Sequence, residues 1–161
     1  MTVVVKSKIQ EQDREAVKFT ILGEITATAD LSEIAAQGSH DRLVFDLSDV
    51  TSINSQGIRV FKETFDQVKN KEIFFERVPS IMIQQINMVV GMIPAQSIIR
   101  SFFVPMYCEA SGSESTRLYV LGRDFQSKAT PNRESVRDEG NNVFEWDVAP
   151  DKYFRFIQRY T

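Results

Sequence analysis

The sequence contains a single cysteine, Cys108, and a single histidine, His40. One thiol cannot form an internal disulfide, and a structural zinc site needs about four cysteine or histidine ligands. We therefore expect no structural metal and no other cofactor. His40 lies in a short polar segment and is interpreted as an exposed turn residue.

Long apolar runs and dense basic clusters are also missing. The stretch from Ile98 to Met106 is interrupted by Arg100 and Ser101, and it is much shorter than the roughly twenty residues that span a bilayer. The start of the chain lacks the basic and apolar regions of a signal peptide. The formal net charge is −3. These features argue against membrane insertion and nucleic-acid binding, so a cytoplasmic protein is expected.

The composition is that of a globular protein with one well-buried core. The chain has 161 residues, of which 42% are hydrophobic and 25% are charged. From the spacing of apolar residues we predict strands over 2–9, 16–22, 42–47 and 72–78, and helices over 31–37, from 55 onward and over 81–90. Gly38 is expected to end the first of these helices. The alternation predicts an α/β fold with parallel strand pairs, preceded by two antiparallel edge strands.

The pattern changes from about residue 97. Strands over 98–107 and 116–121 are predicted to form a hairpin, 126–142 is interpreted as a mobile loop, and the aromatic-rich segment 151–160 is predicted to be a terminal helix. We therefore expect a domain of residues 1–96 and an extension of residues 97–161 packed on it. The apolar helix over 81–90 is expected to be buried beneath the hairpin.

Residues 18–93 resemble the STAS family, named for sulfate transporters and anti-sigma factor antagonists. The resemblance rests on Gly23-Glu-Ile25, on Phe45-Asp-Leu-Ser48 at the end of a buried strand, and on Val50-Thr-Ser-Ile-Asn-Ser-Gln-Gly57 before an amphipathic helix. It implies a STAS-like mixed sheet with helices and a non-enzymatic, bacterial regulatory module that binds another protein. A serine kinase or an anti-sigma factor is the kind of partner that it implies.

The resemblance can be carried over residue by residue at the last of these motifs. Asn54 stands where the family commonly has an aspartate, Ser55 stands where the anti-sigma antagonist branch has its phosphorylated serine, and Gly57 stands where the family has glycine. Ser55 is therefore the implied phosphoacceptor. It also lies at the start of a predicted helix, where its hydroxyl could cap the helix, so both interpretations stay open.

The expected partner-binding surface is the polar strand-to-helix junction and the start of the following helix. Its residues are Asp46, Ser48, Asp49, Ser52, Asn54, Ser55, Gln56, Gly57, Arg59 and Lys62. No nucleophile and base accompany the acidic residues in the sequence, so an enzyme is not expected.

The segment Ser101 to Gly112 is similar to an extension found after some bacterial STAS-like domains, in which a Cys-x-x-Cys motif begins a zinc ribbon. Here Cys108 is kept and Ser111 stands at the second position. The similarity implies a degenerate zinc ribbon that has lost its metal ligands. Apolar residues would then hold the hairpin together; the candidates are Phe102, Val104, Met106, Leu118 and Val120.

Two other functions remain open at this stage. STAS relatives also serve as cytosolic accessory domains of transport systems, and some bind nucleotides or lipids, which implies a small-ligand function as the first alternative. The methionine-rich helix over 81–90 and the hairpin could instead form a homodimer, which would make the protein a self-associating scaffold.

Overall fold

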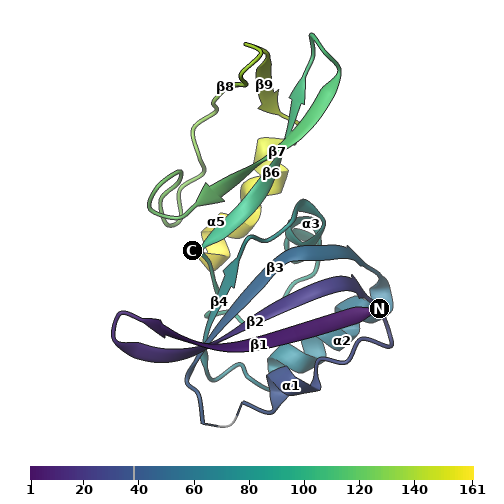
Figure 1. Ribbon diagram of the computed structural model, residues 1–161, viewed down its shortest axis with the longest axis vertical. Helices are drawn as coiled ribbons and strands as arrows, with labels where there is room; N and C mark the ends of the chain where they lie inside the picture. Colours follow the sequence, from purple (N-terminus) through teal and green to yellow (C-terminus); the bar gives the residue numbers. More distant parts are fainter. Residues whose placement is uncertain (38) are drawn as a thin grey trace.

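The computed structural model describes residues 1–37 and 39–161. Its first sheet has five strands in the order β1-β2-β3-β4-β5 (Figure 1). They are β1 (Thr2–Glu11), β2 (Arg14–Ile25), β3 (Arg42–Ile53), β4 (Glu72–Glu76) and β5 (Ile98–Ile99). β1 and β2 are antiparallel, and the other pairs are parallel. The predicted α/β fold with a mixed sheet is confirmed. Only β1 is an edge strand of the predicted antiparallel pair, because β2 also pairs with β3.

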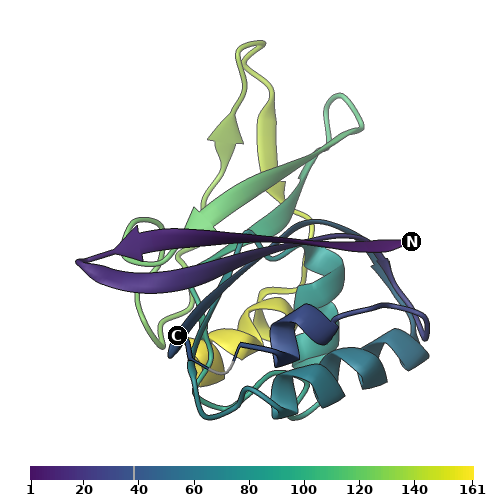
Figure 2. The same ribbon diagram turned by 60° about the horizontal axis from the view of Figure 1, so that its bottom comes forward.

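Three helices connect the parallel strands. They are α1 (Ser32–Ala35), α2 (Ser55–Asp66) and α3 (Ser80–Met88). Each is close to its predicted position, although the ends differ by several residues. The prediction that Gly38 ends the first helix falls outside the described residues. Figure 2 shows α1 and α2 on the same side of the first sheet.

Aromatic side chains fill the space between the first sheet and its helices. Phe45 of β3 stacks on Phe19 with ring centroids 5.3 Å apart, and it meets Phe65 of α2 at 4.7 Å and Phe75 of β4 at 5.4 Å. Phe61 lies 4.5 Å from Phe65 on the same helix. These rings are fully or almost fully buried, as the amphipathic pattern of α2 predicts.

The other face of the first sheet carries charged side chains that pair across the strands. Because successive residues of a strand point to opposite faces, Phe74 and Glu76 lie on the face opposite to Phe75. Arg100 lies 2.7 Å from Glu11 and 3.3 Å from Glu76, and its guanidinium is 3.7 Å from the centre of the Phe74 ring. The central part of β3 is therefore buried on both faces, as predicted, but charged side chains provide part of the cover on one face.

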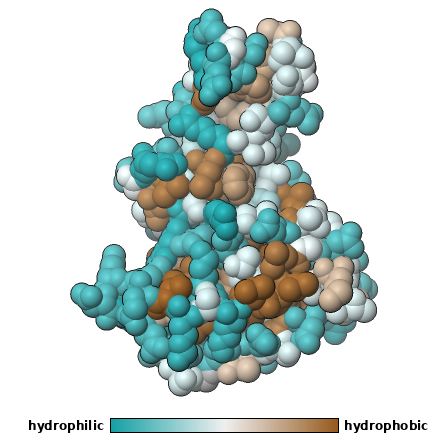
Figure 3. Space-filling view, viewed as in Figure 1, coloured by the Kyte–Doolittle hydropathy of each residue, from teal (hydrophilic) through white to brown (hydrophobic). Residues whose placement is uncertain are grey.

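An apolar patch lies at the N-terminal half of β1. Val3 is 43% exposed and Val5 is 52% exposed, and Val3 lies directly opposite Leu22 of β2. Figure 3 shows this patch as brown surface close to the amino terminus. The lysines of the same strand, Lys6 and Lys8, are exposed.

The second sheet has four strands in the order β7-β6-β9-β8. They are β6 (Ser101–Cys108), β7 (Ser113–Val120), β8 (Val136–Arg137) and β9 (Val143–Trp146). The chain ends in α4 (Pro150–Tyr153), the 3-10 helix η1 (Phe154–Phe156) and α5 (Ile157–Tyr160). The predicted hairpin and terminal helix are confirmed. The segment interpreted as a mobile loop contains β8, which pairs with β9, so that prediction is wrong for this part.

The strand predicted over 98–107 is two strands in different sheets. β5 completes the first sheet, and β6 begins the second after the single residue Arg100. The backbone joins the sheets again at Val78, whose N–H donates to Ser101 O at 3.1 Å and whose carbonyl accepts from the N–H of Phe103 at 2.9 Å. Composition gave no sign of this change, because both strands are apolar.

The C-terminal segment packs on α3 around Phe102. This ring lies 4.9 Å from Phe156 and 5.2 Å from Phe125. On α3, Met82, Ile83 and Ile86 are buried, as expected for a helix beneath the hairpin. Of the apolar residues predicted to hold the hairpin together, Phe102, Val104 and Met106 are buried. Leu118 and Val120 are half-buried.

Candidate functional site

At the junction between β3 and α2, strand β3 is longer than the sequence predicted. The polar residues after position 47 were expected to leave the sheet, but β3 continues to Ile53. The strand contains a bulge, because Thr20 pairs with Asp46 while Leu22 pairs with Asp49. The Ser48 N–H donates to the Asp46 carboxylate at 3.1 Å, which fixes the bulge.

The side chain of Asp46 is buried and has a structural role. Its side chain is 1% exposed, its Oδ2 accepts from Arg77 Nε at 2.9 Å, and Lys18 Nζ lies 3.6 Å away. Burial acts to raise the pKa of Asp46, but the hydrogen bonds from Arg77 and Ser48 outweigh it, so the pKa lies below its ordinary value. The interpretation of Asp46 as a partner contact is therefore corrected, since its carboxylate is enclosed and already paired.

Asn54 caps helix α2. Its backbone is extended, with φ −104° and ψ 176°, and its Oδ1 accepts a hydrogen bond from the Gly57 N–H at 2.8 Å. The interpretation of Ser55 as the cap is therefore wrong by one position. An aspartate at position 54 would present the same carboxylate oxygen to this amide, which explains how asparagine keeps the local structure.

Gly57 is required by the close approach of α2 to β2. A Cβ atom at this position would lie 1.9 Å from the backbone oxygen of Ile25. Ile25 O also accepts from the Asn54 N–H at 3.3 Å, so the start of the helix is held against the end of β2. Gly57 is buried and contributes to the site through the backbone, not as a contact surface.

The remaining predicted partner residues form the accessible part of the junction. Asp49, Ser52, Asn54, Ser55, Gln56 and Arg59 are exposed, and Ser48 and Lys62 are half-buried. The two cations are paired within the helix, with Arg59 2.8 Å from Glu63 and Lys62 3.0 Å from Asp66. The Ser55 hydroxyl makes no hydrogen bond with any residue that the structure describes, so it points to solvent or to a partner.

The described residues of this junction form no cluster of metal-ligating side chains. Across residues 1–37 and 39–161, no group of three or more His, Cys, Asp or Glu side chains is placed to hold a metal ion. The helices in this part of the chain are all too short or too polar to cross a bilayer. The junction is a polar surface that can be contacted or modified.

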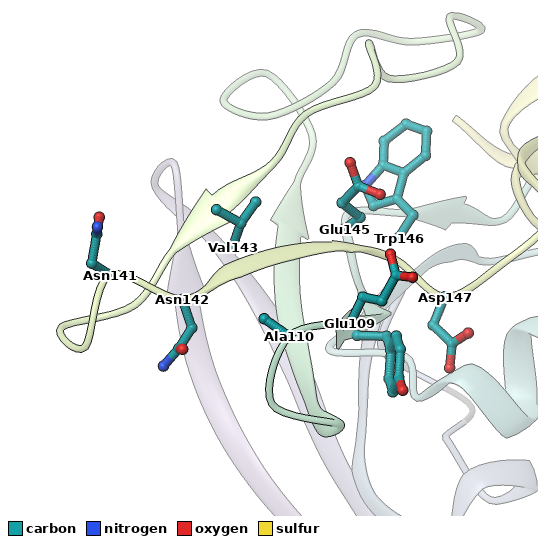
Figure 4. Close-up of a pocket in the computed structure, with 9 residues that line it drawn as sticks. Glu109, Ala110, Asn141, Asn142, Val143, Glu145, Trp146 and Asp147 are labelled. Atoms are coloured by element: carbon teal, nitrogen blue, oxygen red, sulfur yellow. The ribbon is translucent and has the colours of Figure 1, made fainter.

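Two features near functional surfaces were missed by the sequence analysis. The first is Arg77, whose pairing with Asp46 depends on a positive φ of 48° just after β4. The second is a groove of about 800 Å³ on the second sheet, between the β6–β7 and β8–β9 turns. Figure 4 shows the carboxyl groups of Glu109, Glu145 and Asp147 toward one end of this groove and the amides of Asn141 and Asn142 at the other. Glu145 in β9 and Asp147 just after it, two residues apart, were the available sequence signal.

Comparisons with known proteins found a family model and a solved structure that are similar to part of this chain. No curated protein matches the chain. Among solved structures, an uncharacterised protein with a SpoIIAA-like fold from Shewanella loihica matches with 15% identity and a TM-score of 0.28. That match covers 47% of this chain and 66% of that protein, just under two thirds of its length, and at this TM-score it carries no functional argument. The model of the STAS domain family matches residues 9–86, so the segment that contains the whole β3–α2 junction is similar to STAS domains.

Proposed function

We propose that this protein is a non-enzymatic regulatory module of the anti-sigma factor antagonist type, which binds a protein partner through the β3–α2 junction. The observation that carries the proposal is the position of Ser55. It is the first residue of α2, it is exposed, and its hydroxyl has no hydrogen-bond partner in the described part of the chain. The match of the STAS family to residues 9–86 supports this choice of surface.

Phosphorylation of Ser55 is the proposed control of this interaction. A phosphate adds a charge of about −1.5 to −2, which is stabilised at the amino end of a helix. Asp46 would not oppose it, since Ile53 lies seven positions further along β3 than Asp46 and each position rises about 3.3 Å. The modification would change the contact surface without disturbing the Asn54 cap.

The proposed partner surface is narrower than the sequence indicated. It consists of the side chains that are accessible next to Ser55, namely Asp49, Ser52, Asn54, Gln56, Arg59 and Lys62, with Ser48 at its border. The cytoplasmic location, the bacterial origin, the division into residues 1–96 and 97–161, and the degenerate zinc ribbon stay predictions.

The test uses the full chain, with candidate anti-sigma kinases from the cell that makes it. Mass spectrometry of phosphopeptides first asks whether Ser55 is modified, and pull-downs then compare wild type with Ser55→Ala and Ser55→Asp. We expect Ser55→Asp to lose binding and Ser55→Ala to keep it. Ser80 is the matched control, because it is the first residue of α3 as Ser55 is of α2, and Ser80→Asp should bind as wild type does. Identical binding by all four proteins would exclude control at Ser55.

A further inference from the structure

The second sheet carries a binding surface of its own. We propose that the face of this sheet around Tyr107 binds an extended, positively charged peptide segment of a partner protein. This proposal does not depend on the function proposed for the β3–α2 junction.

The strand register places carboxylates on both sides of Tyr107. On β7, Glu114 lies directly opposite Tyr107, and on β9, Glu145 lies directly opposite it. Residues that lie opposite each other in antiparallel strands point to the same face of the sheet. Tyr107 is 40% exposed, so its ring and both carboxylates are presented together.

Two further acids extend this surface into the groove between the hairpins. Glu109 comes from the turn that follows β6, and Asp147 follows β9, where its N–H donates to Pro105 O at 2.9 Å. Both line the 800 Å³ groove with Tyr107 and Glu145, as Figure 4 shows for the three labelled acids. The residues that line this groove include no lysine and no arginine.

The charges of this surface are largely uncompensated. Within the described part of the chain, Glu109, Glu114 and Asp147 form no ion pair, and Glu145 has one contact, with Arg133 at 3.8 Å. Arg133 and Glu145 are both well exposed, so this contact is weak and can be exchanged. It also shows that a guanidinium can reach the carboxylate of Glu145.

The carboxylates and the tyrosine ring of this surface indicate which kind of ligand it can bind. A guanidinium or ammonium group can stack on a tyrosine ring while it donates hydrogen bonds to neighbouring carboxylates. The net charge of the surface repels nucleic acid. In the part of the chain that the structure describes, the side chains are also not grouped closely enough to hold a metal ion. The long arginine and lysine side chains of an extended peptide can reach both carboxylates, because Glu114 and Glu145 lie on strands about 4.8 Å to either side of β6.

Part of the opposite face of the same sheet is covered by the terminal helix. Met106 and Trp146 lie opposite each other there, and Trp146 packs on Phe154 of the terminal helix with ring centroids 4.8 Å apart. Met106 is buried. A peptide on the face with Tyr107 would therefore not compete with this packing.

The experiment measures the binding of a fluorescent hexa-arginine peptide to the full chain at low ionic strength, with hexa-glutamate as the negative control. We expect saturable binding that weakens as salt is added. The double variant Glu114→Gln/Glu145→Gln and the variant Tyr107→Ala should each weaken binding about tenfold. Glu139→Gln is the matched control, because this exposed acid lies outside the groove lining, and it should change binding less than about twofold.

A variant that should strengthen binding separates loss of the site from misfolding, because a misfolded protein would only bind more weakly. Arg133→Ala removes the competing guanidinium and should strengthen binding about threefold, whereas Lys69→Ala, which makes the same change in net charge just after α2, should not. Circular dichroism confirms that each variant is folded. Equal weakening by Glu139→Gln and by the double variant would show general attraction and overturn the proposal. Displacement of the peptide by millimolar calcium, or salt-sensitive dimers in light scattering without peptide, would likewise replace it with a cation site or self-association.

Discussion

Arg77 Nε lies 2.9 Å from Oδ2 of Asp46, so the residue that follows β4 is held to the middle of β3. The same arginine donates its backbone N–H to Ser101 Oγ at 2.8 Å, at the start of β6. This one residue therefore links the central strand of the first sheet to the first strand of the second. Its positive φ of 48° is the backbone conformation that makes both contacts possible.

Removing the Arg77 side chain should destabilise the protein. Arg77→Ala leaves the enclosed carboxylate of Asp46 with Lys18 and the Ser48 amide, and we expect the free energy of unfolding to fall by about 2 kcal/mol. The loss is smaller than for a fully buried pair, because the Arg77 side chain is about half exposed. Urea denaturation measures it. Arg59→Ala, which breaks an exposed pair on α2, is the control and should leave the urea midpoint almost unchanged.

The Asp46 pair should also make stability depend on pH. The pKa of Asp46 is lowered in the folded protein, so the folded state binds the proton less readily than the unfolded state. The stabilisation is therefore present above the unfolded pKa and is lost as pH falls below about 4. Urea midpoints measured from pH 7 to pH 3 should fall less steeply for Asp46→Asn than for wild type. Parallel curves would contradict this assignment.

Gly57→Ala should destabilise the protein, although alanine is the better helix former. Alanine is favoured over glycine by about 1 kcal/mol in an exposed helix interior. Here the new Cβ would lie 1.9 Å from Ile25 O, and the strain should exceed that gain by about 2 kcal/mol. Thermal unfolding measures the difference. Ser55→Ala, two residues earlier, should leave the melting temperature unchanged, and a stabilised Gly57→Ala protein would show that α2 does not rest on β2 as described.

The helix cap predicts different effects for two substitutions of Asn54. Asn54→Ala removes the acceptor of the Gly57 N–H and should cost about 1 kcal/mol. Asn54→Asp keeps an acceptor oxygen there and should leave the stability within about 0.5 kcal/mol of wild type. Chemical denaturation compares the two variants. The aspartate variant also restores the acid that STAS relatives commonly have, so its modification at Ser55 can be measured on an intact fold.

The buried phenols of Tyr119 and Tyr153 should make the protein lose stability as the pH rises above about 10. Burial, with a hydrogen bond to Glu134, raises the pKa of Tyr119 to about 12, and burial raises the pKa of Tyr153 further. Because the folded pKa is above the unfolded one, stability is complete below about pH 10 and is lost as pH rises above it. Titration of phenolate absorbance should show delayed ionisation that coincides with unfolding. Tyr107→Phe removes an exposed phenol and should leave the unfolding pH unchanged.

The sequence predicted the elements of the first sheet well because their apolar residues follow clear periods of two and of three to four. It failed where a long-range contact decides the structure. Residues Ser48 to Ile53 look like a loop, yet pairing with β2 and the bulge at Asp46 keep them in the strand. β8 is too short and polar to be recognised without its partner β9.

At the candidate site, the start of helix α2 was predicted correctly, but the roles of its first residues were not. The motif at 54–57 located the start of α2, whereas the division of roles between cap, exposed serine and packed glycine came from the contacts of Asn54 and Gly57. The surface around Tyr107 could not be predicted in full, because Glu145 reaches it from β9, a strand that is distant in sequence from β6.

The single residue between β5 and β6 has a consequence for how this protein can be divided. Arg100 donates its backbone N–H to Phe75 O and accepts one from Leu121 at its carbonyl, both at 2.8 Å, so it belongs to both sheets at once. No flexible linker separates them, and the apolar side chains of both sheets form one continuous cluster. We therefore expect that the residues from Ser101 onward cannot be removed without exposing this cluster. We also expect that a protease would not release the first sheet as an independent fragment, because no exposed linker joins the two sheets.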